Sequence, residues 1–208
     1  MRHNYLLLLS GLLGLAASCS SNEEAYLPPL LSNSARGNLR FKGPERLNSD
    51  VAAALELPPD AVCTELGMYQ CTSAVHNVAL GGVDPYGTGL YEPSGVTAST
   101  TPLVVERLAW SACIKRVSAD YADLGAAVIF RGIKLSGSKL ASPDGDEVRG
   151  AITQLAQRVF LREPSDAEMT RYIQLARDIE ATGNAEPARA WMQAVCFAVL
   201  SSAEAVFY

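Results

Sequence analysis

The four cysteines beyond residue 60 limit how this chain can fold, because a bridge between any two of them ties separate segments together. They are Cys63, Cys71, Cys113 and Cys196. Four cysteines allow three pairings, and sequence alone does not choose among them. Cys63 and Cys71 enclose a short loop and would form a local bridge, which leaves Cys113 with Cys196. We predict these two bridges. The alternative is that Cys113 and Cys196 are reduced core residues, since both lie on apolar helix faces.

The N-terminus indicates the compartment in which those cysteines lie. One basic residue, Arg2, precedes an apolar run from Tyr5 to Ala17. Spanning a bilayer takes about 20 apolar residues, and this run is shorter. A short apolar run between a basic start and small residues is typical of a secretory signal. We therefore predict a signal peptide over residues 1–18 and an oxidising compartment for the mature chain.

The signal ends in a sequence that resembles the cleavage site of bacterial lipoproteins, which place an aliphatic residue and two small residues before a cysteine. Here the sequence is Ala16-Ala17-Ser18-Cys19, with Leu15 one place too early. The resemblance implies that Cys19 carries a lipid. Ser20 after the cysteine resembles the pattern of lipoproteins released to the outer membrane, on its periplasmic or surface face. Ordinary signal cleavage after Ser18 is the alternative.

A polar segment with two adjacent prolines follows Cys19. Such a composition favours a tether over a folded element, and we predict a tether or extended segment over residues 19–48. Beyond it, about 160 residues remain, enough for one domain with a hydrophobic core. We expect that domain over residues 49–208.

The charge of the mature chain excludes some partners. Removing Arg2 with the signal leaves 16 basic residues (17 − 1) against 22 acidic ones, a net charge of −6. This balance provides no basic surface for nucleic acid, so we expect no nucleic-acid partner. It also argues against binding to anionic lipid head groups by charge.

Hydrophobic periodicity predicts a mainly α fold, a small helical bundle stapled by disulfides. Thr101 followed by Pro102 is a good helix start, and Ser165 with Glu168 forms a capping box. The last predicted helix contains "AVCFAVL", which is apolar around its circumference, so we expect it at the centre of the bundle. The predicted helices are Asp50–Leu57, one from Thr101, one from Asp146, one from Ser165 to Gly183, and one from Glu186 to Phe207.

Residues 76–102 interrupt this pattern with five glycines and three prolines. We predict a long irregular Gly/Pro loop, a contact surface by default. "GGVDPYGTG" resembles a phosphate-binding loop only superficially, because no Lys-Ser/Thr follows. Asp84 and Glu92 offer oxygen ligands for calcium, without the alternation of an EF-hand. A lid over a small ligand is a weaker possibility for Gly81 to Gly95.

The segment over residues 156–208 resembles a helical segment of large secreted proteins of planctomycetes and myxobacteria, in families of unknown function. There a helix ends in an aromatic residue, an arginine and a proline, as Phe160, Arg162 and Pro164 do here. A long helix then closes on a Ser-Pro-x-Phe-like sequence, here Ser202 to Phe207 with alanine in place of the usual proline. Those proteins are often associated with c-type cytochromes, but this chain has no CxxCH. The resemblance implies an envelope protein with a helical domain and does not imply a redox enzyme.

We find no catalytic set, metal site or cofactor site in the sequence. His76 is the one histidine after the signal, and it would need a nucleophile and an orienting acid to act as a base. The cysteine spacing does not suit zinc. Trp191 belongs to the most apolar helix and is expected in the core, whereas Trp110 lies off the apolar stripe and is a possible interface residue.

Together these observations predict a lipid-anchored, non-catalytic envelope protein. We expect it to be a structural or interaction subunit of a larger assembly, with other envelope proteins as partners. The alternatives are an accessory subunit of a periplasmic or cell-surface redox or hydrolytic enzyme and, more weakly, a small-ligand-binding lipoprotein.

Overall fold

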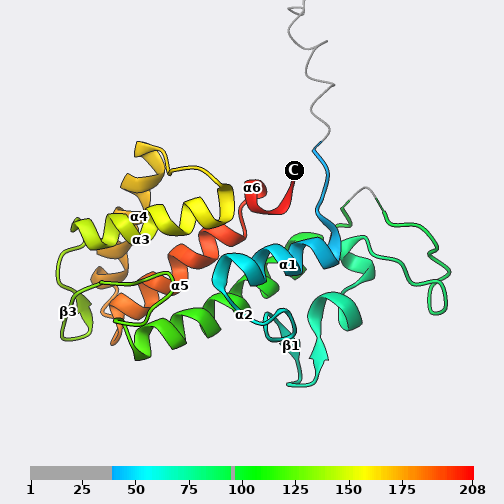
Figure 1. Cartoon of the computed structure of the whole chain (residues 1–208), viewed down its shortest axis with the longest axis horizontal. Coiled ribbons are helices and arrows are strands. Elements are labelled where there is room, and N and C mark those ends of the chain that lie inside the picture. The colour runs from blue at the N-terminus through cyan, green and yellow to red at the C-terminus, as the bar shows by residue number, and fades with distance from the viewer. Residues whose placement is uncertain (1–38, 95–96) are drawn as a thin grey trace, which may run out of the picture. The chain divides into compact units, whose positions relative to one another are not determined.

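The computed structural model describes residues 39–94 and 97–208, and their arrangement is shown in Figure 1. The predicted signal peptide, the predicted lipidation site Cys19 and the first part of the predicted tether lie outside the described residues. Residues 39–208 form one compact unit.

The domain is mainly α, as predicted from the sequence. Two short antiparallel hairpins, β1–β2 and β3–β4, accompany the helices. The elements in chain order are α1 (Gly43–Leu55), η3 (Pro59–Ala61), β1 (Thr64–Glu65), β2 (Tyr69–Gln70), η4 (Cys71–Val75), η5 (Val78–Leu80), α2 (Thr101–Ala122), β3 (Leu135–Ser136), β4 (Lys139–Leu140), α3 (Asp146–Phe160), α4 (Asp166–Ala181), α5 (Pro187–Leu200) and α6 (Ala203–Val206).

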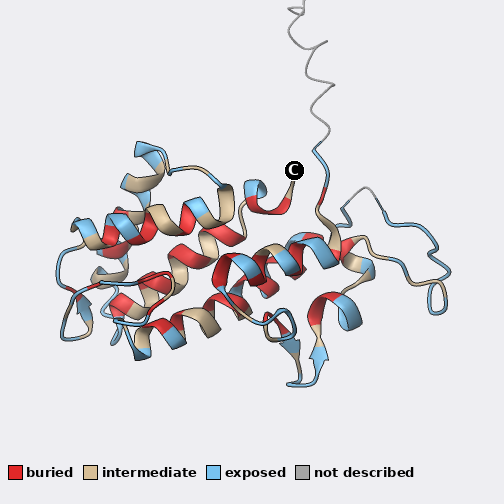
Figure 2. Cartoon of the chain, viewed as in Figure 1, coloured by how far each residue is buried: buried red, intermediate tan, exposed pale blue. Residues whose placement is uncertain are grey.

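Helix α5 is the centre of the domain, as its apolar circumference predicted. It contacts α2, α3, α4 and α6, and Figure 2 shows buried residues along it and along the inward faces of its neighbours. Trp191 is fully buried on α5, and its indole N–H donates to the carbonyl oxygen of Tyr172 at 2.9 Å. The Phe130 ring meets the Trp191 ring edge-on, with centroids 5.9 Å apart. The expectation of core packing for Trp191 is therefore confirmed.

Both predicted disulfides are present. Cys63–Cys71 closes the segment that holds the β1–β2 hairpin, and Cys113–Cys196 joins α2 to α5 across a sequence separation of 83. The alternative of reduced core cysteines at Cys113 and Cys196 is therefore wrong. Two disulfides are typical of an oxidising extracytoplasmic environment, where such bonds persist. Within residues 39–94 and 97–208, no helix has the length and apolar character that crossing a membrane requires.

The structured part begins earlier than the sequence predicted. Helix α1 starts at Gly43, with a proline in its first turn, whereas we expected a tether through residue 48 and a helix from Asp50. The preceding residues pair with the C-terminal segment. The Arg40 N–H donates to the Tyr208 carbonyl at 3.0 Å, and the Lys42 N–H donates to the Val206 carbonyl at 3.1 Å. This non-local pairing has no signature in the sequence.

The last helix is shorter than predicted, because two serines interrupt it. Helix α5 ends at Leu200, and α6 is a separate turn. The Ser201 hydroxyl donates back to the Phe197 carbonyl at 2.7 Å, and the Ser202 hydroxyl accepts from the Ala205 N–H at 3.3 Å. Ser202 is thus an N-cap that starts a new helix in a different direction.

The start of α4 has the predicted capping box, which an arginine links to α6. Ser165 and Glu168 exchange the two capping hydrogen bonds. Arg162 donates to both carboxylate oxygens of Glu168 at 2.9 Å and to both oxygens of Glu204 at 2.6 and 2.8 Å. The hydrogen bonds from Arg162, then those from Ser165, lower the pKa of Glu168 to about 2. Glu168 is therefore ionised at neutral pH, and the turn after α3 is held by charge.

A buried aspartate fastens the loop that follows α2. Asp120 is fully buried near the end of α2. Its carboxylate accepts the backbone N–H groups of Val128, Ile129 and Phe130 at 2.9–3.1 Å. Arg116, one turn earlier, places its Nε 2.8 Å from the same carboxylate. Asp120 thereby holds Phe130 against Trp191, and the sequence analysis did not single it out.

Candidate functional site

Exposed apolar side chains gather around the β1–β2 hairpin and the adjoining part of α2. Leu66, Met68 and Tyr69 on the hairpin are all exposed. Arg107 on α2 binds the carboxylate of Glu65, the strand residue next to the turn, so the hairpin lies against this part of α2. Residues three and four apart share one side of a helix, which places Leu103 and Trp110 beside Arg107. We call the set Leu66, Met68, Tyr69, Leu103 and Trp110 the hairpin face.

Leu66 is held in an unfavourable backbone conformation at the tip of the hairpin. Leu66 and Gly67 both have positive φ angles, 52° and 73°. Tight hairpin turns require this, and glycine or asparagine usually fills such positions. A left-handed conformation costs an ordinary residue about 1–2 kcal/mol. The Leu66 side chain is 86% exposed, so it does not recover that cost by packing within the domain.

Ionic contacts fix the hairpin to α2, and the Cys63–Cys71 bond closes the open end of the hairpin. Glu65 receives both the Arg107 guanidinium and His76, whose Nε2 lies 3.1 Å from the carboxylate. The hydrogen bond from Arg107, followed by that from His76, lowers the pKa of Glu65 to about 2. The Lys115 ammonium donates to the Ala61 carbonyl at 2.6 Å. These contacts therefore hold the hairpin, with Leu66 at its tip, in a fixed position on the domain.

His76 lies in this charged cluster, as a half-buried partner of Glu65. The sulfurs of Cys63 and Cys71 and the Glu65 carboxylate lie within 4.8 Å of one another. Because the two sulfurs are bonded to each other, they are not thiolate ligands in this state.

The predicted Gly/Pro loop is largely irregular where the structure describes it. It contains η5 and one bridge between Asp84 and Leu90. The Asp84 carboxylate, one of the two proposed calcium ligands with Glu92, accepts the Gly87 N–H at 2.9 Å and so stabilises a turn. At the other end, the Thr101 hydroxyl donates to the Ala79 carbonyl at 2.6 Å.

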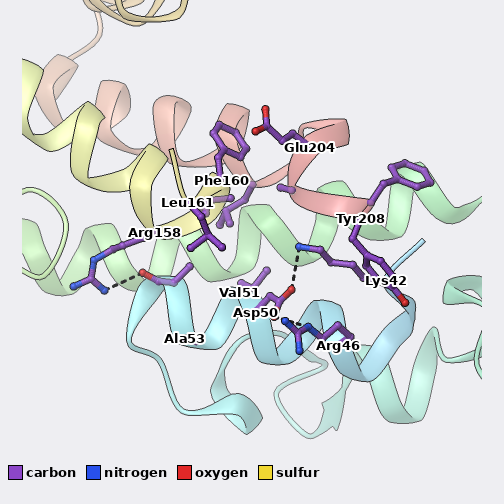
Figure 3. Close-up of a pocket in the computed structure, with 15 residues that line it drawn as sticks. Lys42, Arg46, Asp50, Val51, Ala53, Arg158, Phe160, Leu161, Glu204 and Tyr208 are labelled. Atoms are coloured by element: carbon purple, nitrogen blue, oxygen red, sulfur yellow. Dashed lines mark hydrogen bonds and ion pairs between the residues drawn. The ribbon is translucent and has the colours of Figure 1, made fainter. Parts of the chain in front are cut away.

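A pocket of about 720 Å³ lies elsewhere, between α1, the end of α3 and α6, and Figure 3 shows its lining. Its lining includes no residue of the loop over residues 76–102. The pocket is therefore not one that a lid over Gly81 to Gly95 would close, and the sequence analysis did not identify it.

Trp110 is where the sequence analysis expected it, half-exposed on α2 with 46% of its surface accessible. Its buried edge meets the Phe197 ring at a centroid distance of 5.8 Å. Leu66 and Met68 were not predicted from the sequence, although "ELGM" between two cysteines contains the signal, a leucine beside a glycine in a tight turn.

Comparisons with protein-family models, with curated proteins and with solved structures found no match to this chain.

Proposed function

We propose that this protein is a lipid-anchored, non-catalytic subunit of an outer-membrane assembly, on the periplasmic or surface face, and that it binds another envelope protein through the hairpin face. The lipoprotein-like sequence at Cys19 supports the anchor, and the two disulfides support the compartment. The observation that carries the proposal is Leu66, a large apolar side chain that is exposed at a position unfavourable to leucine.

The composition of the hairpin face supports a protein partner. Tryptophan, tyrosine and methionine are enriched at protein interfaces, and the hairpin face contains one of each. Interface residues that contribute most to affinity are aromatic anchors surrounded by residues that exclude water. Trp110 has this character, since its ring packs on Phe197 and about half of its surface, 46%, is accessible. The exposed Leu66 and Met68 would surround it in a complex.

The anchor is tested by replacing its cysteine. Cys19→Ser is expected to move the protein from the membrane fraction to the soluble envelope fraction, because the acyl chains supply the membrane affinity. Fractionation with immunodetection measures this, and metabolic labelling with a radioactive fatty acid measures acylation directly. A membrane-bound, labelled Cys19→Ser protein would contradict the anchor, as would an unlabelled wild type.

The interface is tested by Leu66→Asn, with Leu161→Asn as the matched control. Both leucines have positive φ angles and are almost fully exposed, 86% and 89%, and only Leu66 belongs to the hairpin face. Asparagine tolerates this conformation, so both variants are expected to keep or raise the free energy of unfolding, by up to about 1 kcal/mol. Leu66→Asn is expected to weaken partner binding about tenfold, and Leu161→Asn is expected to leave it unchanged.

The measurement is quantitative mass spectrometry of proteins that co-purify with each variant from membranes in mild detergent. Thermal unfolding of the same preparations verifies folding. A partner recovered equally with wild type and Leu66→Asn would overturn the assignment of the hairpin face. A cytochrome or hydrolase among the stoichiometric partners would identify the assembly as an enzyme with this chain as its accessory subunit.

A further inference from the structure

The pocket between α1, α3 and α6 has the volume of a small-molecule site. Its volume of about 720 Å³ falls within the range of small-molecule sites, roughly 300–1,000 Å³. Lys42, Arg46 and Asp50 lie on one wall, as Figure 3 shows, and Phe160 and Leu161 at the end of α3 lie across from them. This location is separate from the hairpin face.

Part of the pocket lining is apolar. Val51, Ala54, Leu200 and Ala205 line it and are buried. Leu161 is 89% exposed at the rim, in the left-handed conformation that ends α3 with φ 58°. Glycine is the usual residue there, and leucine costs about 1–2 kcal/mol. The side chain does not repay that cost by packing within the domain, and a ligand in the pocket would cover it.

The corner formed by α1 is positively charged. Lys42 Nζ lies 3.0 Å from Asp50, and Arg46 Nε lies 2.9 Å from the other oxygen of the same carboxylate. Two cations therefore share one anion. The second carboxylate in the lining, Glu204, has both oxygens bound by Arg162.

The third cation in the lining, Arg158, is already occupied. Its guanidinium donates to the Ala54 carbonyl at 3.2 Å and to Glu56 at 2.6 Å. The excess positive charge of the pocket therefore lies at Lys42 and Arg46, within reach of the apolar part of its lining.

We propose that this pocket binds an amphipathic organic monoanion. Its carboxylate head binds Lys42 and Arg46, and its apolar body lies along Leu200 and Val51 beneath Leu161. The ligand carboxylate then pairs with the positive charge of Lys42 and Arg46 that Asp50 does not neutralise, and the ligand body removes the Leu161 side chain from water. It does not depend on the hairpin face or on a protein partner.

The test uses three probes with the same ten-carbon chain and different heads, each below its micelle concentration. They are decanoate, decanol and decyltrimethylammonium, titrated calorimetrically into the soluble Cys19→Ser chain. Decanoate is expected to bind with one-to-one stoichiometry, about tenfold more tightly than decanol, because a charged hydrogen-bonded head adds roughly 1.5 kcal/mol or more. Decyltrimethylammonium is expected to bind most weakly, since its head is repelled by Lys42 and Arg46.

Two variants separate the head from the body of the ligand. Lys42→Gln with Arg46→Gln is expected to reduce decanoate affinity about tenfold, to the level of decanol, and to leave decanol unchanged. Leu161→Asn is expected to reduce the affinity for both probes about tenfold, because the leucine side chain no longer covers the chain. Leu66→Asn, with the same backbone conformation outside the pocket, is the control and is expected to change neither.

Backbone amide shifts in a two-dimensional NMR spectrum locate the bound probe, with changes expected in α1, the end of α3 and α6. Equal affinity for the three probes would overturn the proposal, as would unchanged decanoate binding by the Lys42→Gln, Arg46→Gln variant. So would shifts confined to the hairpin face. None of these results bears on the partner experiment with Leu66→Asn, so the two proposals fail separately.

Discussion

Replacing Asp120 with alanine is expected to lower the free energy of unfolding by about 3–5 kcal/mol, the range for breaking a buried ion pair. The substitution removes the acceptor of three backbone N–H groups, from Val128, Ile129 and Phe130, and the partner of Arg116. The Ile129 and Phe130 donors then lie in the interior with no acceptor, and a buried donor without a partner costs about 1–3 kcal/mol. The loss is large because Asp120 has no access to water.

The matched control is Asp123→Ala, three residues further along the chain. Asp123 is exposed and accepts the N–H groups of Gly125 and Ala126 at 3.0 and 3.2 Å. Because water replaces an exposed acceptor, its removal is expected to cost about 1 kcal/mol or less. Urea unfolding followed by circular dichroism measures both variants. A similar loss for both would show that the buried carboxylate does not organise this loop.

Removing the Cys113–Cys196 bond, with alanine at both positions, is expected to lower the free energy of unfolding by about 4.5 kcal/mol. In the chain-entropy account a bond stabilises the fold by restricting the unfolded chain, and more so for a long loop. This bond closes a sequence separation of 83, between the long helix α2 and the central helix α5. Without it, the unfolded chain gains conformational freedom that the native packing must overcome.

The Cys63–Cys71 bond is the comparison for this loss of stability, because its sequence separation is only 8. The same account assigns its removal about 2.5 kcal/mol. Chemical unfolding of the two double-alanine variants under non-reducing conditions measures both losses. The expectation fails if the short bond proves the more stabilising of the two. The Cys63, Cys71 variant is also expected to loosen the hairpin and weaken partner binding.

Local signals predicted much of this fold. The helix that starts at Thr101 follows from a threonine and proline, and the helix after Ser165 follows from a capping box. These features act within a few residues, so the sequence displays them directly. The disulfide pairing was predicted from the short loop between Cys63 and Cys71, although the sequence alone allows three pairings.

Features that depend on distant parts of the chain could not be predicted. Asp120 looks like an ordinary polar residue near a helix end, and its role depends on where the tertiary fold brings residues 128–130. Helix α1 starts at Gly43 next to residues that pair with Val206 and Tyr208, far along the sequence. The pocket could not be predicted for the same reason, since its walls come from α1, α3 and α6, which are distant in the sequence.

The hairpin face was predicted from the sequence only in part. Trp110 was identified from helical periodicity, because its position off the apolar stripe is a local property. The exposure of Leu66 was not identified, since leucine in an ordinary turn would be expected to fold back onto the core. Its backbone conformation directs it outward, and the Leu66–Gly67 pair in a tight turn was the sequence feature that could have indicated this.

The antiparallel contact of Arg40 and Lys42 with Val206 and Tyr208 also decides how the domain bears mechanical tension. A force applied between Leu39 and Tyr208 loads these hydrogen bonds before it reaches α1. After they part, the covalent link between α2 and α5 limits how far the domain can extend, because the residues that it encloses cannot be drawn out. Each enclosed residue would otherwise add about 3.3–3.6 Å of reach. Under tension, reduction of the Cys113–Cys196 bond would therefore lengthen the extended chain by the whole segment that the bond encloses.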